Sequence, residues 1–198
     1  MRLPSFLAST FLIVTLVFCG TDMLSATGKA PLDKPVVYDG FQFSPPKEWS
    51  ALSPDRFQSE VVKKVAASVN SSTTWIPRPI QAFESKDSSL CVVSYLEPKT
   101  PALENQDEPA RNLASSFQKQ FKKLGAVDRN DLTSNGLSLY QLRVVMETMV
   151  ILKTIFLSPS NRMVQIDLYV PRGSFDTQKE SVSRSLLSLS ASIGPALR

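Results

Sequence analysis

The sequence contains no histidine, and only two cysteines, Cys19 and Cys91, occur in its 198 residues. Without imidazole the chain cannot build Ser-His or Cys-His catalytic pairs, a histidine-ligated zinc site or a histidine proton shuttle. If a leader that contains Cys19 is removed, Cys91 is left as a single thiol, and no intrachain disulfide framework can form. The missing residue types therefore exclude several common classes of enzyme and of metal site.

An excess of charge of one sign is also missing. Lys and Arg total 22 against 18 for Asp and Glu, which gives a formal net charge of +4. No basic run is dense and interleaved with aromatic residues, so we expect no nucleic-acid partner. The remaining composition, with 42% hydrophobic and 20% charged residues, is typical of a globular domain with a real core.

What the chain does have is a leader, which we predict to span residues 1–26. Arg2 precedes an apolar run from Phe6 to Phe18, and small residues follow at Ser25 and Ala26. This layout is that of a secretory signal, and the run is short for a membrane span, which needs about 20 residues. We therefore expect an extracytoplasmic protein, either periplasmic or secreted.

Cys19 has two interpretations. The stretch Leu16-Val17-Phe18-Cys19 resembles a bacterial lipoprotein signal in which Cys19 would be acylated, so that the chain would be anchored to a membrane. Phe18 departs from that pattern, since Gly, Ala or Ser usually precedes the cysteine. In the other interpretation, Cys19 is one apolar residue of an ordinary leader that is removed near Ser25 and Ala26.

Residues 27–37 are polar and proline-bearing, which predicts a linker, and residues 38–194 are predicted to form a single α+β domain. Three segments, near 53–69, 107–125 and 174–194, have the apolar period of amphipathic helices. The expected apolar stripes are Phe57, Val61, Val65 and Val69; Ala110, Leu113, Ala114, Phe117, Phe121 and Leu124; and Phe175, Val182, Leu186, Leu189 and Ile193.

About six strands are predicted, in a mostly antiparallel twisted sheet, because short loops join consecutive strands. Seven segments have strand patterns, the short 41–43 and then 80–84, 90–96, 126–133, 137–146, 149–157 and 162–170. Asn135-Gly136 predicts a tight hairpin, since both residues accept positive φ. In the last strand Val164, Ile166, Leu168 and Val170 share one face, and Gln165 and Asp167 are expected on a second, solvated face. Cys91 is predicted to be a packed small hydrophobe.

This order of elements resembles the α/β/α sandwich of the PsbP-type extrinsic proteins of photosystem II, the Ran-binding Mog proteins and the DcrB-type bacterial lipoproteins. Of these groups, the leader matches the DcrB-type exported proteins best. The resemblance covers roughly Tyr38 to Ser192 and implies a non-enzymatic accessory or binding domain without catalytic residues or a cofactor. The residues that carry it are Phe41, Phe43, Pro46, Trp49, the strand 164–168 and the closing helix 175–193.

Two patterns suggest catalysis or metal binding, and we favour a simpler interpretation of both. Ser116 and Lys119 fit the S-x-x-K pattern of penicillin-binding enzymes, but the Ser-x-Asn and Lys-Thr-Gly elements of those enzymes are missing. The run 128–131 suggests a calcium loop, yet Leu132 stands at a ligand position and the glycine spacing fails. We therefore expect no metal site, and a serine hydrolase remains an alternative only.

The candidate binding residues lie in a loop and on a helix. Trp75, in the predicted loop 70–79, is expected to be an exposed contact, whereas Trp49 is expected in the core. The basic face of the second helix is the candidate surface for an anionic partner such as a membrane, and it consists of Arg111, Lys119, Lys122 and Lys123. The sequence thus predicts an exported, non-catalytic accessory, binding or assembly protein of the cell envelope, whose partner is an unknown envelope protein or small ligand. A peripheral membrane-surface binder is the second alternative.

Overall fold

The computed structural model describes residues 32–68, 74–103 and 108–192. The predicted leader with Cys19, the predicted cap Asp107 and the last residue of the predicted third stripe, Ile193, lie outside these ranges. Within them, no helix is both long and apolar enough to cross a membrane.

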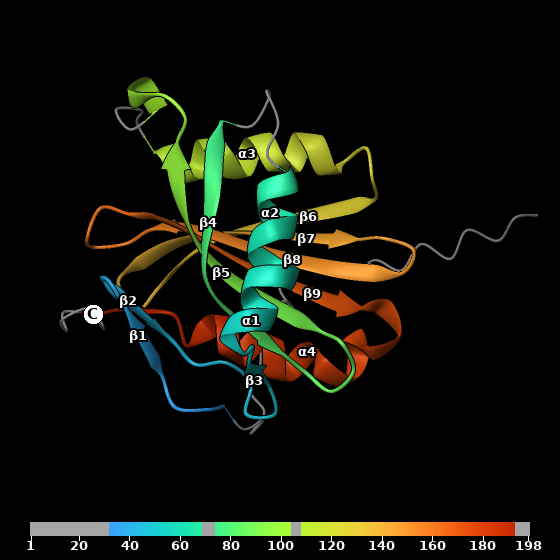
Figure 1. Cartoon of the computed structure of the whole chain (residues 1–198). Coiled ribbons are helices and arrows are strands. Elements are labelled where there is room, and N and C mark those ends of the chain that lie inside the picture. The colour runs from blue at the N-terminus through green and yellow to red at the C-terminus, as the bar shows by residue number, and fades with distance from the viewer. Residues whose placement is uncertain (1–31, 69–73, 104–107, 193–198) are drawn as a thin grey trace, which may run out of the picture.

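Seven strands form the main sheet, in the order β3-β4-β5-β9-β8-β7-β6, and every neighbouring pair is antiparallel (Figure 1). Their bounds are β3 Ser50–Ala51, β4 Trp75–Glu84, β5 Leu90–Pro98, β6 Ala126–Ser134, β7 Leu137–Val145, β8 Met149–Leu157 and β9 Met163–Pro171. A small second sheet consists of β1 (Val36–Tyr38), β2 (Phe41–Phe43) and β10 (Ser190–Ala191), with β2 in the middle. The predicted antiparallel α+β architecture is confirmed.

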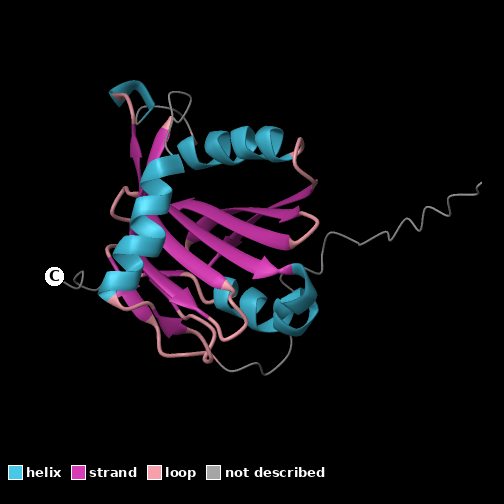
Figure 2. Cartoon of the chain, turned by 45° about the vertical axis from the view of Figure 1, so that its right-hand side comes forward, coloured by secondary structure: helices cyan, strands magenta, loops and turns pink. Residues whose placement is uncertain are grey.

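Helices cover both faces of the main sheet (Figure 2). The first is a continuous rod, which we call the N-terminal rod, built from α1 (Pro54–Arg56), the π-helical η1 (Phe57–Val62) and α2 (Lys63–Ser68). The rod and α3 (Pro109–Phe121) pack on one face, and α4 (Arg172–Leu187) packs with the small sheet on the other. A short 3-10 turn, η2 (Pro101–Leu103), follows β5.

The face under α4 carries the largest apolar core. Val164, Ile166, Leu168 and Val170 are all fully buried there, as their alternation in β9 predicted. The Asn135-Gly136 hairpin is confirmed as well, since φ is 49° and 82° at these residues and Ser134 pairs with Leu137. Local pattern therefore specified both the register and the inner face of the meander.

The second face of β9 is not solvated, which corrects the prediction for Gln165 and Asp167. Their exposed fractions are only 4% and 6%. The reason is that α3 and the N-terminal rod cover this face, so its polar groups must satisfy one another. Lys153 Nζ donates to Asp167 Oδ1 at 2.6 Å and Gln165 Nε2 donates to Asp167 Oδ2 at 2.5 Å, and the ammonium also lies 4.6 Å from the centre of the Phe117 ring.

The prediction of an exposed loop at Trp75 is wrong. β4 begins at Trp75, whose side chain is 9% exposed and packs in the cluster under α3. Pro77 and Pro79 argued against a strand there, because proline cannot donate to a ladder. They are accommodated because β3 pairs only with Phe83 and Glu84 at the other end of β4, which leaves the proline segment at a sheet edge.

The two ends of the domain also differ from the prediction. β1 begins at Val36, inside the predicted linker 27–37, because it pairs with β2. At the other end α4 stops at Leu187, although a helix to residue 194 was predicted. The Ser188 hydroxyl accepts a hydrogen bond from the backbone N–H of Ser44 at 2.9 Å, and the chain then pairs with β2 as β10. The segment predicted as the last helical turns is therefore a strand that pairs with a distant part of the chain.

Candidate functional site

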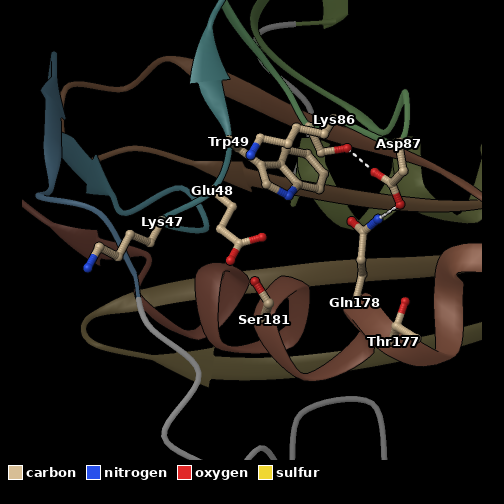
Figure 3. Close-up of a pocket in the computed structure, with 9 residues that line it drawn as sticks. Lys47, Glu48, Trp49, Lys86, Asp87, Thr177, Gln178 and Ser181 are labelled. Carbon is tan, nitrogen blue, oxygen red and sulfur yellow. Dashed lines mark hydrogen bonds between the residues drawn. The ribbon is translucent and has the colours of Figure 1, made fainter.

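A polar cavity of about 410 Å³ lies beside α4, where three elements meet (Figure 3). The connection from β2 to β3, the turn between β4 and β5, and one side of α4 each contribute to its lining. The lining residues are Lys47, Glu48, Trp49, Ser85, Lys86, Asp87, Thr177, Gln178 and Ser181. We call this site the α4 cavity.

Asp87 ties the β4–β5 turn to α4. Its carboxylate accepts hydrogen bonds from the hydroxyls of Ser85 and Ser89, the latter at 3.3 Å, and from the Nε2 of Gln178 on α4. Burial by itself would raise the pKa of Asp87, but the hydrogen bonds from Ser85, Ser174, its own backbone and Ser89 together outweigh it, and the net effect is a lowered pKa. The carboxyl group is therefore ionised and held in one position.

Gln178 has an unused acceptor at this site. Its Nε2 donates both to Asp87 and, at 3.0 Å, to the Ser89 hydroxyl, which directs Oε1 the other way, towards the Trp49 and Glu48 side of the cavity (Figure 3). Oε1 is buried and has no hydrogen-bond partner within the described ranges. A buried acceptor without a donor costs free energy, so this oxygen is a natural contact for a bound molecule.

Trp49 forms one wall of the α4 cavity. It is 5% exposed and belongs to the main apolar core, so the prediction of a core position is confirmed. Its indole nitrogen and the Glu48 carboxylate face the space above Ser181 (Figure 3). The lining thus combines an aromatic wall with acceptors at Glu48 and Gln178, an arrangement typical of small-ligand sites.

The predicted basic face is on the other side of the sheet from the α4 cavity. Lys119, Lys122 and Lys123 are all exposed near the C-terminal end of α3. The next residue, Leu124, is 59% exposed, so its predicted place in the apolar stripe is wrong, because α3 ends at Phe121. Arg111 is exposed too, but its guanidinium pairs with Glu108 at 2.7 Å and lies over the Tyr140 ring. The candidate surface therefore consists of three lysines and one leucine, and we call these four residues the α3 patch.

The remaining candidates lack the surroundings that their proposed chemistry needs. The Ser116 hydroxyl donates to the backbone carbonyl of Asn112 at 3.1 Å, on the exposed side of α3. Asp128 pairs with Arg143, and no group of three metal-ligating side chains occurs in the part of the chain that the structure describes. Cys91 is fully buried, and burial, reinforced by the charge of Asp167, raises the pKa of its thiol, which confirms the prediction of a packed residue.

Sequence reasoning missed the α4 cavity. Its residues come from three segments far apart in the chain, and none of them was predicted to bind a ligand, since Trp49 was expected only as a core residue. The one local signal was the serine and aspartate content of 85–89, where side chains that accept hydrogen bonds from their own turn are common. Nothing in the periodicity of α4 marked Gln178, because its meaning depends on the turn that it contacts.

No protein-family model matches the chain, and no curated protein is similar to it. Among solved structures, it is similar to the cyanobacterial PsbP (CyanoP) of Synechocystis sp. PCC 6803, with 16% identity, a TM-score of 0.46, and coverage of 84% of this chain and 95% of that one. LpqN of Mycobacterium tuberculosis, which is involved in cell envelope biogenesis, matches with 12% identity and a TM-score of 0.40, over 80% of this chain and 90% of LpqN. Neither similarity carries an argument about what this chain binds.

Proposed function

We propose that this chain is an exported, non-catalytic binding module of the cell envelope, and that it holds a small polar ligand in the α4 cavity. The observation that carries the proposal is the buried, unpartnered Oε1 of Gln178 beside a pinned carboxylate and an aromatic wall. The leader supports export, and the resemblance to DcrB-type exported proteins is consistent with an accessory role.

The chemistry of the lining defines the class of ligand. Gln178 Oε1 and the Glu48 carboxylate are acceptors, so a molecule that donates hydrogen bonds fits them. Lys47, Lys86 and the indole N–H of Trp49 can donate to its acceptors. Trp49 offers apolar surface next to them. Sugar-type hydroxyls and ammonium groups both satisfy this requirement, since each donates hydrogen bonds from a small carbon skeleton.

Titration of the purified chain with glucose, N-acetylglucosamine and putrescine tests the ligand class. We expect heat of binding by calorimetry for one of the two chemistries, with a dissociation constant weakened roughly tenfold in Gln178→Met, because a buried hydrogen bond of about 1–3 kcal/mol is lost. Gln120→Met, on the exposed side of α3, is the matched control and should bind like the unmodified chain. Absence of binding at millimolar probe, or equal binding by Gln178→Met, would contradict the proposal.

The envelope location has its own measurement. Mass spectrometry of the mature N-terminus from the native host should show removal of the leader near Ser25 and Ala26, or a diacylglycerol-modified Cys19. An intact Met1 in a chain recovered from the cytoplasm would refute export. It would leave the ligand site of the α4 cavity to be judged by the titrations alone.

A second candidate function is attachment to an anionic membrane surface through the α3 patch. An exposed leucine flanked by lysines suits an interface in which the apolar side chain enters the headgroup region and the ammonium groups contact phosphate. Lys119, Lys122 and Lys123 supply the charge, and Leu124 the apolar contact. The same helix keeps its other side on the sheet, so docking needs no unfolding.

We expect the double variant Lys122→Gln, Lys123→Gln to bind phosphatidylglycerol vesicles roughly thirtyfold more weakly in a sedimentation assay, since each lysine contributes about 1 kcal/mol near such a surface. Added salt should weaken binding of the unmodified chain, because it screens the attraction. The double variant Lys63→Gln, Lys64→Gln removes two exposed charges from α2 and is the matched control. Equal loss in both variants, or binding that ignores salt, would speak against a role of the α3 patch.

A further inference from the structure

The main sheet ends in an unpaired edge. β6 is the last strand in the order, and its outer side pairs with no other strand that the structure describes. α3 packs mainly on β7 and β8 and also contacts β6, where the Arg129 side chain donates to the Ser115 hydroxyl at 2.7 Å, but no described strand pairs with the outer backbone groups of β6. An open edge of nine residues is a ready template for another strand.

The hairpin determines which backbone groups of β6 point outward. In its two-residue turn, the C=O of Ser134 and the N–H of Leu137 face each other. Ser134 of β6 and Leu137 of β7 therefore form a hydrogen-bonded pair. Because such pairs alternate, the even-numbered residues of β6 are bonded to β7. The N–H and C=O groups of Val127, Arg129, Asp131 and Thr133 therefore point to the free edge.

Two of these four outward residues carry opposite charges on the same face of the strand. Arg129 Nε donates to Asp131 Oδ1 at 2.7 Å, and the exposed fractions of these side chains are 17% and 39%. Asn130 lies midway between them. A second β6 strand, placed antiparallel with Asn130 opposite Asn130, would put each Arg129 opposite the Asp131 of the other copy.

We propose that the outer edge of β6 pairs with β6 of a second copy of this chain, antiparallel and about a two-fold axis at Asn130. In this register, outward residues face outward residues, so each of the four bonds to a partner. An axis at Arg129 would place Arg129 opposite itself, and an axis at Asp131 would place two carboxylates opposite each other, and like charges directly opposite are destabilising. Charge therefore selects one register among those that the backbone allows.

The pairing has a geometric consequence for the rest of the molecule. A two-fold axis perpendicular to the sheet keeps the same face on the same side in both copies. The two α3 helices then lie on one side of a continuous sheet, and the two α4 cavities lie on the other. The dimer rests on neither proposed function.

Charge complementation tests the register. In Asp131→Arg both central charges of the edge are positive, and in Arg129→Asp both are negative. Each variant alone should therefore dimerise at least roughly tenfold more weakly than the unmodified chain. Mixed in equal amounts, the two should form a heterodimer, because every central contact is again between opposite charges. Sedimentation equilibrium of each variant and of the mixture measures this. Unchanged dimerisation of the single variants, or no recovery in the mixture, would overturn the proposal.

A cysteine cross-link gives a second test that does not depend on Arg129, which also bonds the Ser115 hydroxyl at 2.7 Å. In a Cys19→Ser background, Asn130→Cys should form an intermolecular disulfide on mild oxidation, since the two Cα atoms would lie about 4.5 Å apart in a non-hydrogen-bonded pair. Asp128→Cys, on the same face, would lie about 14 Å from its counterpart, four residues away at about 3.4 Å per residue, and should not cross-link. A chain that is monomeric at millimolar concentration, or equal cross-linking at both positions, would refute the β6 dimer.

Discussion

Replacing Asp167 by alanine is expected to lower the free energy of unfolding by about 3–5 kcal/mol, among the largest effects of any single substitution in this chain. The side chains of Lys153 and Asp167 are only 7% and 8% exposed, and their charges meet under the seam between α3 and the N-terminal rod. Asp167→Ala leaves the Lys153 ammonium buried without a counter-charge, and it removes the acceptor of Gln165. Urea unfolding followed by circular dichroism measures the loss.

The paired replacement distinguishes the cost of an orphaned charge from the worth of the ion pair. Lys153→Met combined with Asp167→Leu removes both charges, and we expect it to be clearly more stable than Asp167→Ala, because the desolvation cost of the pair disappears with its attraction. A deficit of about 1–3 kcal/mol should remain, because the buried Gln165 amide lacks its acceptor in both variants. Glu97→Ala is the exposed control, since it breaks the Arg78 ion pair at the surface, and it should cost less than about 1 kcal/mol. If Asp167→Ala cost no more than Glu97→Ala, the pair would not be buried as described.

The burial of Asp167 also affects its neighbour Tyr169. The Asp167 charge and then burial raise the pKa of the Tyr169 phenol, whose hydroxyl lies 3.5 Å from Asp167 Oδ2. The phenol is therefore neutral and available as a donor. A neutral donor beside the carboxylate is what a buried charge requires, since the remaining lone pairs must also be satisfied.

Phe41→Ala is expected to cost about 3–5 kcal/mol for a different reason, the loss of a large side chain from the core. Phe41 is fully buried in β2, the central strand of the small sheet. Its ring stacks on Tyr38 with centroids 4.7 Å apart and meets Phe156 of β8 edge-on at 5.2 Å. Truncation removes one of the aromatic contacts that hold the small sheet against the main one, and leaves a cavity between them.

Thermal or urea unfolding of two further variants calibrates this result. Phe41→Leu keeps most of the buried volume and should cost clearly less than Phe41→Ala. Leu157→Ala is a truncation at the end of β8, where the side chain is 40% exposed, and we expect less than about 1 kcal/mol there. A loss at Phe41→Ala as small as that at Leu157→Ala would mean that the small sheet is not packed on the core.

The α4 cavity is spatially separate from the α3 patch and from the β6 edge, so its test does not interfere with theirs. The α4 cavity is built on the side of the small sheet and α4, the α3 patch is on the opposite face, and the β6 edge lies at the end of the strand order. A substitution such as Gln178→Met therefore should not change vesicle binding or dimerisation. Residues far apart in space and without shared partners usually act independently.

Patterns with a short range were readable from the chain. A buried strand face was predicted correctly from Val164, Ile166, Leu168 and Val170, and a hairpin from Asn135-Gly136. Alternation and positive φ are properties of neighbouring residues. The exposure predicted for Gln165 and Asp167 was wrong, because polar side chains indicate a solvated sheet face only where no helix covers that face. Trp75 was misplaced because two prolines are excluded from a strand only where both of its sides are paired.

The sequence by itself determined the antiparallel α+β architecture, the meander with its inner face, and the exposure of the α3 lysines, since each follows from the period of side chains along one element. The α/β/α sandwich was likewise expected from the resemblance. Only the tertiary structure decided that the polar face of β9 is a covered one, that α4 ends at Leu187 and is followed by β10, and that Gln178, Asp87 and Trp49 meet at one cavity. These features depend on which distant segments come together. The association of distant segments is favoured because it buries apolar surface, and a short stretch of sequence does not show which segments will associate.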